Sequence, residues 1–142
     1  MRSIVLTKNR RIAWNCTYSR RWAYKMTYAE INALIKSMGL PVTYHHWQPG
    51  KVPPLPYVVF WFDDMQHFAA DNVMYQKILS VQLELYSNRK NFAAEEKVER
   101  VLDANEIVYE KYEEYIDTEK LFEQVYTFEV LLEGADEQEG KN

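Results

Sequence analysis

The sequence predicts an α+β domain with a mainly antiparallel sheet and two helices packed on one face. Two observations lead to this class: segments with strand character follow one another in runs, and only two segments carry a helical apolar repeat. The expected order of elements is α-β-β-β-α-β-β. With 142 residues, 47% of them hydrophobic and 15% aromatic, the chain can build one domain with a real core and is not wholly disordered.

The first helix is expected directly after Met26. Thr27 is a typical N-cap and Glu30 follows three residues later, so the two residues predict a capping box. The apolar residues behind them have the i, i+3, i+4, i+7 spacing of one buried face, and a glycine followed by Leu-Pro ends the helix. These residues are Ile31, Leu34, Ile35, Met38 and then Gly39.

Three strands should follow, over Val42 to Trp47, Tyr57 to Phe62 and Val73 to Tyr86. The first two are separated by a loop with four prolines, Gln48 to Pro56, which cannot join a central sheet ladder. The continuous β-branched and aromatic run of the second suits a strand covered on both faces or shared with a neighbouring subunit. Asp63 to Asn72 is expected to be the hairpin connection before the third.

The second helix is predicted from Phe92 to about Asn105, with Asn91 as its N-cap. Its inward stripe is expected to consist of Ala94, Val98, Val101 and Leu102, and its outer face is charged. Two last strands, Val108 to Ile116 and Leu121 to Leu132, complete the predicted sheet.

Charge divides the chain at Met26. Residues 1–25 contain seven Lys/Arg and no acid, which leaves 10 basic and 21 acidic residues for the rest, although the whole chain carries only −4. The basic segment is either an arm with interleaved aromatic residues that stack on nucleic acid, or an extension outside the folded unit, with natural translation starting at Met26. The predicted organisation is therefore a basic extension over 1–25, an α+β domain over 26–133 and a polar disordered tail over 134–142.

No catalytic, cofactor-binding or metal-binding residue is predicted. Cys16 is the single cysteine, the four glycines lie far apart, and none of the five serines sits in a G-x-S-x-G turn. His45 and His46 are adjacent on a strand and should point to opposite faces, and with His67 they match no zinc spacing. The longest apolar run has strand length, far below the roughly 20 residues that span a bilayer, so a membrane protein is not expected.

Tyrosines near the end of the domain form one candidate protein interface. Tyr109, Tyr112 and Tyr115 lie among glutamates in a segment expected to be a twisted or bulged strand. Their rings either cover one sheet edge or provide a contact surface, because tyrosine combines a large area with a hydrogen-bonding group.

Two loops form a second candidate interface. Met65 and Phe68 are expected at an exposed hairpin tip, opposite a proline-stiffened loop that carries Val52 and Leu55. Two apolar residues on one projecting hairpin suggest a contact with another protein.

The stretch from Met26 to about Glu133 resembles the small tail terminator, or tail-completion, proteins of long-tailed bacteriophages and prophages, especially those of Gram-positive hosts. The resemblance rests on a pattern of segments and not on a catalytic motif. They are TYAEINALIKSMGLPVTYHHW, PPLPYVVFWF, VQLELYSNRKNFAAEEKVERVLD and YIDTEKLFEQVYTFEVLL. It implies a non-enzymatic structural protein that forms a ring, a hexamer, at the head-proximal end of the tail tube, stops tube polymerisation and joins the tail to the head connector.

The resemblance also implies the partners and the location. They are further copies of the chain, the major tail tube protein and a head-completion or connector protein, in the virion and in the host cytoplasm during assembly, without a cofactor. The acidic body agrees with a lumen that passes DNA without binding it, because it would repel phosphate. The alternatives are another phage neck protein of similar fold, or a nucleic-acid-binding module that uses residues 1–25.

Overall fold

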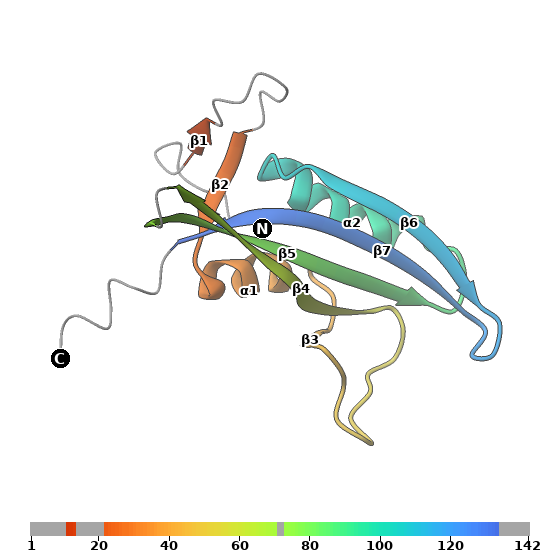
Figure 1. The fold of residues 1–142 in the computed structure, drawn as a ribbon. Helices are drawn as coiled ribbons and strands as arrows, with labels where there is room; N and C mark the ends of the chain where they lie inside the picture. Colours follow the sequence, from red (N-terminus) through yellow and green to blue (C-terminus); the bar gives the residue numbers. More distant parts are fainter. Residues whose placement is uncertain (1–10, 14–21, 71–72, 134–142) are drawn as a thin grey trace.

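The α+β class is confirmed by a computed structural model, which describes residues 11–13, 22–70 and 73–133 (Figure 1). From α1 onward the elements follow the predicted order α-β-β-β-α-β-β, but two strands that were not predicted precede α1. In chain order the elements are β1 (Arg11–Ala13), β2 (Trp22–Met26), α1 (Tyr28–Lys36), β3 (Val42–Tyr44), β4 (Tyr57–Ala70), β5 (Val73–Ser87), α2 (Phe92–Ala104), β6 (Tyr109–Ile116) and β7 (Leu121–Leu132).

Both helices begin at the predicted caps. The Thr27 hydroxyl accepts a hydrogen bond from the Glu30 amide at 3.1 Å, and the Asn91 side chain accepts one from the Ala94 amide at 3.1 Å. Each cap satisfies a backbone N–H that has no partner inside its helix. The helix α1 ends at Lys36, and Gly39 follows with φ +78°, a conformation that glycine adopts at little cost.

The sheet is mixed, so the expectation of a mainly antiparallel sheet is confirmed only in part. Its strand order is β1-β2-β7-β5-β4-β3, and β6 pairs with β7 as well. The pairs β4–β5, β5–β7, β6–β7 and β1–β2 are antiparallel, whereas β3–β4 and β2–β7 are parallel. The proline loop between Tyr44 and Tyr57 explains one parallel pair, because parallel neighbours need a connection of about a dozen residues or more.

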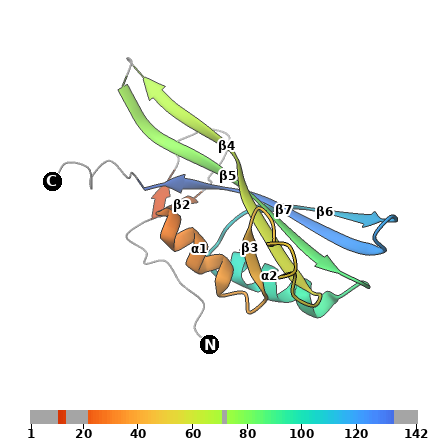
Figure 2. The same ribbon diagram turned by 90° about the horizontal axis from the view of Figure 1, so that it is seen from below.

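The hairpin connection expected over Asp63 to Asn72 is much shorter than predicted, because β4 continues into it as far as Ala70, whereas β5 starts at Val73 as expected. The strand β4 runs to Ala70 and β5 starts at Val73, with register shifts between Phe62 and Asp64 and between Phe68 and Ala69. A bulge inserts one extra residue and breaks strict alternation, so a bulged strand can resemble a loop in sequence. The β4–β5 hairpin projects past the other strands (Figure 2), since β5 pairs with β7 only from Lys77 onward.

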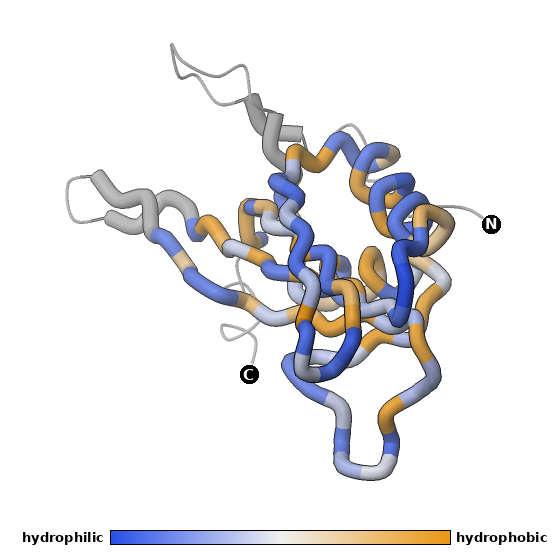
Figure 3. Tube along the Cα trace, turned by 90° about the vertical axis from the view of Figure 1, so that its right-hand side faces the viewer, coloured by the Kyte–Doolittle hydropathy of each residue, from blue (hydrophilic) through white to orange (hydrophobic). Residues whose placement is uncertain are grey.

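One hydrophobic core lies between the two helices and one face of the sheet. It contains the buried stripe of each helix together with alternate residues of β5 and β7; Figure 3 shows the hydrophobic and hydrophilic residues interleaved along these elements. The predicted helical stripes are confirmed, and the core members include Ile31, Leu34, Ile35, Met38, Ala94, Val98, Val101, Leu102, Leu79, Val81, Leu83, Leu85, Tyr126, Phe128, Val130 and Leu132. In the described part of the chain, the opposite sheet face carries no helix.

The start of the domain lies inside the sheet. The strand β2 pairs with the end of β7 at Lys25↔Leu131 and Met26↔Leu132, the Met26 side chain is fully buried, and the Glu133 amide donates to the Met26 carbonyl at 2.8 Å. The division of the chain at Met26 stays a prediction; most of the basic segment and the tail over 134–142 lie outside the described residues. Within the described ranges neither helix has the length and apolar content for a membrane crossing.

Candidate functional site

The three predicted interface tyrosines lie on β6, which is a regular strand without the expected bulge. Its register with β7 is continuous from Tyr109↔Phe128 to Ile116↔Leu121. Because side chains alternate along a strand, Tyr109 and Tyr115 share one face and Tyr112 points to the other. On the helix-covered side, the ring centroids of Tyr109 and Tyr126 are 5.7 Å apart, and those of Tyr115 and Phe122 are 4.9 Å apart.

Tyr112 is therefore the tyrosine of the three that the structure presents on the helix-free face. Its side chain is 58% exposed, and its hydroxyl donates to Glu114 at 3.2 Å. Tyr115 is 46% exposed beside Phe122, whereas Tyr109 is half-buried against the core. The structure does not bring the three rings together into one patch.

The second candidate interface is divided between a loop and a strand. Val52 is 56% exposed on the loop between β3 and β4, and Leu55 on the same loop is half-buried. Met65 is not at an exposed tip as expected, because it lies on β4, half-buried and packed against the core. The backbone of Phe68 pairs with Gln76, and its side chain lies outside the described residues.

Besides the outer edge of β1, two sheet edges are unpaired in the described part of the chain. The strand β3 covers β4 only from Val58 to Phe60, and no described strand pairs with the outer edge of β6. Asp63 and Asp64 sit at a bulge on the first edge, and Lys111 with several glutamates lines the second. Charges and bulges discourage addition of a further strand, so the side-chain faces are better contact surfaces than the edges.

Two buried carboxylates and a tyrosine form a cluster on the helix-free face. The Tyr86 hydroxyl lies 2.5 Å from Glu84 Oε2 and 2.8 Å from Glu123 Oε1, and Gln82 donates to Glu84 Oε1 at 3.2 Å. Glu84 and Glu123 are only 8% and 9% exposed. Burial and these two carboxylates raise the pKa of Tyr86 far above its ordinary value, so the phenol keeps its proton.

Sequence reasoning missed this cluster. Tyr86 lies directly opposite Glu123 in the β5–β7 pair, and Glu84 is two residues before Tyr86 on the same face. The polar residues alternate with apolar ones along β5, which was the available signal, but their partners depend on the register with β7.

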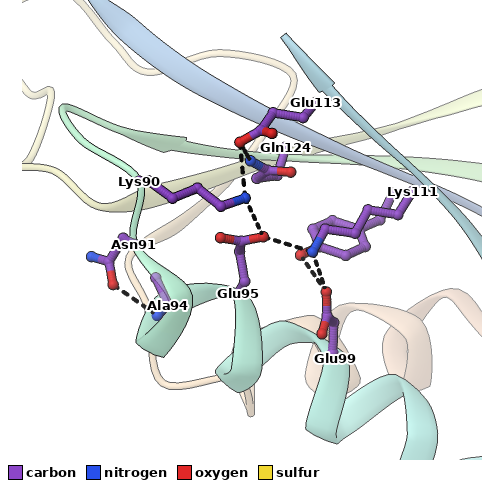
Figure 4. A network of polar contacts seen from close by, with 9 residues as sticks. Lys90, Asn91, Ala94, Glu95, Glu99, Lys111, Glu113 and Gln124 are labelled. Atoms are coloured by element: carbon purple, nitrogen blue, oxygen red, sulfur yellow. Dashed lines mark hydrogen bonds and ion pairs between the residues drawn. The ribbon is translucent and has the colours of Figure 1, made fainter. Parts of the chain in front are cut away.

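A second polar cluster connects α2 to β6 and β7 on the helix-covered side (Figure 4). Glu95 is 3% exposed, and its Oε1 lies 3.1 Å from Lys90 Nζ and 2.6 Å from Lys111 Nζ. Lys111 also contacts Glu99 at 2.6 Å, and Lys90 also contacts Glu113 at 2.8 Å. The arrangement is that of a structural tie, because each charge is paired with a charge on another element, although Glu95 Oε2 is buried without a hydrogen-bond partner among the described residues.

Glu113 completes this network from β6. It accepts hydrogen bonds from Lys90 at 2.8 Å and from Gln124 Nε2 at 2.6 Å. The hydrogen bond from Lys90 is the main reason why the pKa of Glu113 lies below its ordinary value, and the bond from Gln124 adds to it.

The two adjacent histidines contact each other, so the expectation that they point to opposite faces is wrong. Their Nδ1 atoms are 3.0 Å apart and their rings meet edge to face. The reason is that β3 ends at Tyr44 and His45 has φ +67°, which interrupts strand alternation. In the part of the chain that the structure describes, no three His, Cys, Asp or Glu residues come together as metal ligands. Cys16 and the side chain of His67 lie outside that part.

Comparison of the sequence with protein-family models gave no match, and comparison with curated proteins gave none.

Proposed function

We propose that this protein is a phage assembly protein of the tail-terminator type. It forms a ring at the head-proximal end of the tail tube, stops tube polymerisation and joins the tail to the head connector. The unit that does this is the domain over 26–133, with the order α-β-β-β-α-β-β and a mainly antiparallel sheet. The proposal begins from the resemblance of this stretch to tail-completion proteins, and the arrangement of the surfaces supports it.

The observation that carries the proposal is the one-sided covering of the sheet. Both helices share a core with one face, while the helix-free face presents half-buried apolar and aromatic groups such as Trp61, Ile78 and Val125. The β4–β5 hairpin projects past the end of β7 (Figure 2). A one-sided sheet and a projecting arm provide two different surfaces. Two different surfaces that meet head to tail form a ring when the rotation between neighbouring subunits closes.

The distribution of acid agrees with a lumen that DNA crosses. Glu110, Glu113 and Glu114 are exposed along β6, and Asp117 and Glu119 are exposed in the turn after it. A ring that places this edge toward its centre repels phosphate and lets DNA pass without specific binding.

The experiment is the mass in solution, measured by light scattering over a concentration series. It compares the full chain with a version that starts at Met26, each alone and with a tail tube protein. The version from Met26 lacks Trp22 to Lys25 of β2, so circular dichroism must first show that it is folded.

A multimer that persists in the version from Met26, alone or on the tube, supports a ring built by the domain. Monomers under every condition contradict the proposal. Salt-dependent DNA binding by the full chain that disappears in the version from Met26 would instead favour the nucleic-acid-binding module.

A further inference from the structure

The Tyr86 hydroxyl has one proton and two carboxylate neighbours. It lies 2.5 Å from Glu84 Oε2 and 2.8 Å from Glu123 Oε1, both within hydrogen-bond distance. One hydroxyl proton can make one strong hydrogen bond or be shared weakly between two acceptors. If both glutamates were ionised, two carboxylates would compete for this single hydrogen. The geometry therefore favours a second proton in the cluster.

The position of that second proton follows from the donors. Glu84 already has two, Gln82 Nε2 at 3.2 Å and the Tyr86 hydroxyl at 2.5 Å. Glu123 has the Tyr86 oxygen at 2.8 Å and a side-chain contact with Glu84, and the contact with Glu84 raises the pKa of Glu123. When Tyr86 donates to Glu84, its oxygen is free to accept, and a protonated Glu123 supplies the missing hydrogen.

The surroundings of Glu123 add negative charge and, among the described residues, no ion-paired cation. Glu84 and Tyr86 face it from β5, and Glu114 lies directly opposite it on β6 beside Tyr112. From β4, Tyr57 stacks on Tyr86 with ring centroids 5.5 Å apart. Among the described residues, no lysine or arginine forms an ion pair with Glu84, Glu114 or Glu123.

We propose that Glu84, Tyr86 and Glu123 form a proton-sharing cluster that holds one extra proton in the folded protein, so that the stability of the sheet decreases as this proton is lost. The inference does not depend on the proposed role in phage assembly. It makes the stability of the sheet sensitive to pH at the helix-free face, since the cluster carries one negative charge with the proton and two without it.

The direction of the effect follows from the environment of Glu123. Burial, followed by the charges of Glu84 and Glu114, raises its pKa above the ordinary value of 4.5, although the hydrogen bond with Tyr86 opposes the shift. Between 4.5 and this raised value the folded state binds more protons than the unfolded state. The stability that the proton contributes is therefore complete at pH values below the pKa of Glu123 in the unfolded chain. It is lost as the pH rises through the higher pKa of Glu123 in the folded protein.

The direct test is a carbon-13 NMR titration of the glutamate carboxyl groups in the full-length protein. We expect Glu123 to keep its proton at pH values where an ordinary glutamate has lost it. Titration of Glu123 at or below the ordinary value overturns the proposal, and this measurement needs no variant.

The second test is the unfolding equilibrium over pH 4 to 9 for wild type, Glu123→Gln and Glu129→Gln. One extra proton in the folded state changes the unfolding constant by up to about tenfold per pH unit within the window. Glu123→Gln should remove that slope, because an amide donates without titrating. Glu129 lies on the same strand and face but is exposed, so Glu129→Gln should keep the wild-type slope. Equal slopes in wild type and Glu123→Gln contradict the proposal.

Discussion

The hydroxyl of Tyr126 on β7 donates a hydrogen bond to the carboxylate of Glu99 on α2, 3.1 Å away. Tyr126 is fully buried, so this contact fixes α2 over the centre of the sheet from within the core. The ammonium of Lys111 lies over the same ring, 5.6 Å from its centroid, and also binds Glu99 at 2.6 Å. Helix, sheet and edge strand therefore meet at one carboxylate.

Tyr126→Phe should lower the free energy of unfolding by about 1 kcal/mol, the usual net contribution of one intramolecular hydrogen bond. The ring and its contact with Lys111 remain in the variant, so little packing is lost. Tyr112→Phe is the matched control, because that hydroxyl is exposed and its bond to Glu114 competes with water. Urea unfolding of both variants measures the difference. Equal losses would show that burial of the Tyr126 hydroxyl does not matter.

Glu95→Ala should destabilise the protein by about 2 kcal/mol, because it removes the buried acceptor shared by Lys90 and Lys111. Both lysines are about one third exposed, so water compensates part of the loss. Glu96→Ala changes the next residue on the same helix, where an exposed pair with Arg100 at 3.9 Å contributes little. Thermal unfolding compares the two. A loss in Glu96→Ala as large as in Glu95→Ala would contradict this account of the network.

Protonation of Glu113 in acid should lower the free energy of unfolding. The pKa of Glu113 is lowered chiefly by the hydrogen bond from Lys90. The stability that ionised Glu113 contributes is therefore present at pH values above its pKa in the unfolded chain, and it is lost as the pH falls through its lower pKa in the folded protein. Glu113→Gln should therefore flatten the fall of stability below about pH 4.5. Glu110→Gln, on the opposite face of the same strand, should not change it, since Glu110 makes no ion pair within the described ranges. Unfolding curves at pH 2 to 6 test this, and a fall in Glu113→Gln as steep as in wild type would disprove it.

Val52→Asp should weaken ring assembly while leaving the domain folded, because a charge buried at a contact is not compensated. Val108→Asp is the control: the two valines are 56% and 67% exposed, but Val108 belongs to no candidate interface. Light scattering under the conditions in which wild type assembles gives the readout. Unchanged mass in Val52→Asp removes the proline loop from the proposed contact surface.

The parts of the fold that depend on neighbouring residues were predictable from sequence. The caps Thr27 and Asn91 act on amides three residues away, so both helix starts were predicted at the right residues. The apolar stripes of both helices were also correct, since a 3.6-residue period identifies a buried face without reference to its partner.

The parts that depend on distant residues were not predictable. The pairing of Met26 with Leu132 joins segments from opposite ends of the domain, and the bulge near Asp63 turned an expected loop into strand. The candidate cluster needs Tyr86 and Glu123 to face each other, which only the β5–β7 register determines. The contact between His45 and His46 was not predictable either, because the positive φ of His45 follows from how the chain leaves β3 and not from its residue type.

The central position of β7 has a consequence for how the chain is synthesised. This strand is the last element in the described part of the chain, yet it pairs with β5 on one side and with β6 and β2 on the other. A nascent chain on the ribosome can form its helices and the β4–β5 hairpin early. The pairs of β5, β6 and β2 with β7 cannot form until β7 has left the ribosome. Contacts between such distant segments form slowly, so folding of this domain is completed after translation of β7 and not progressively from the N-terminus.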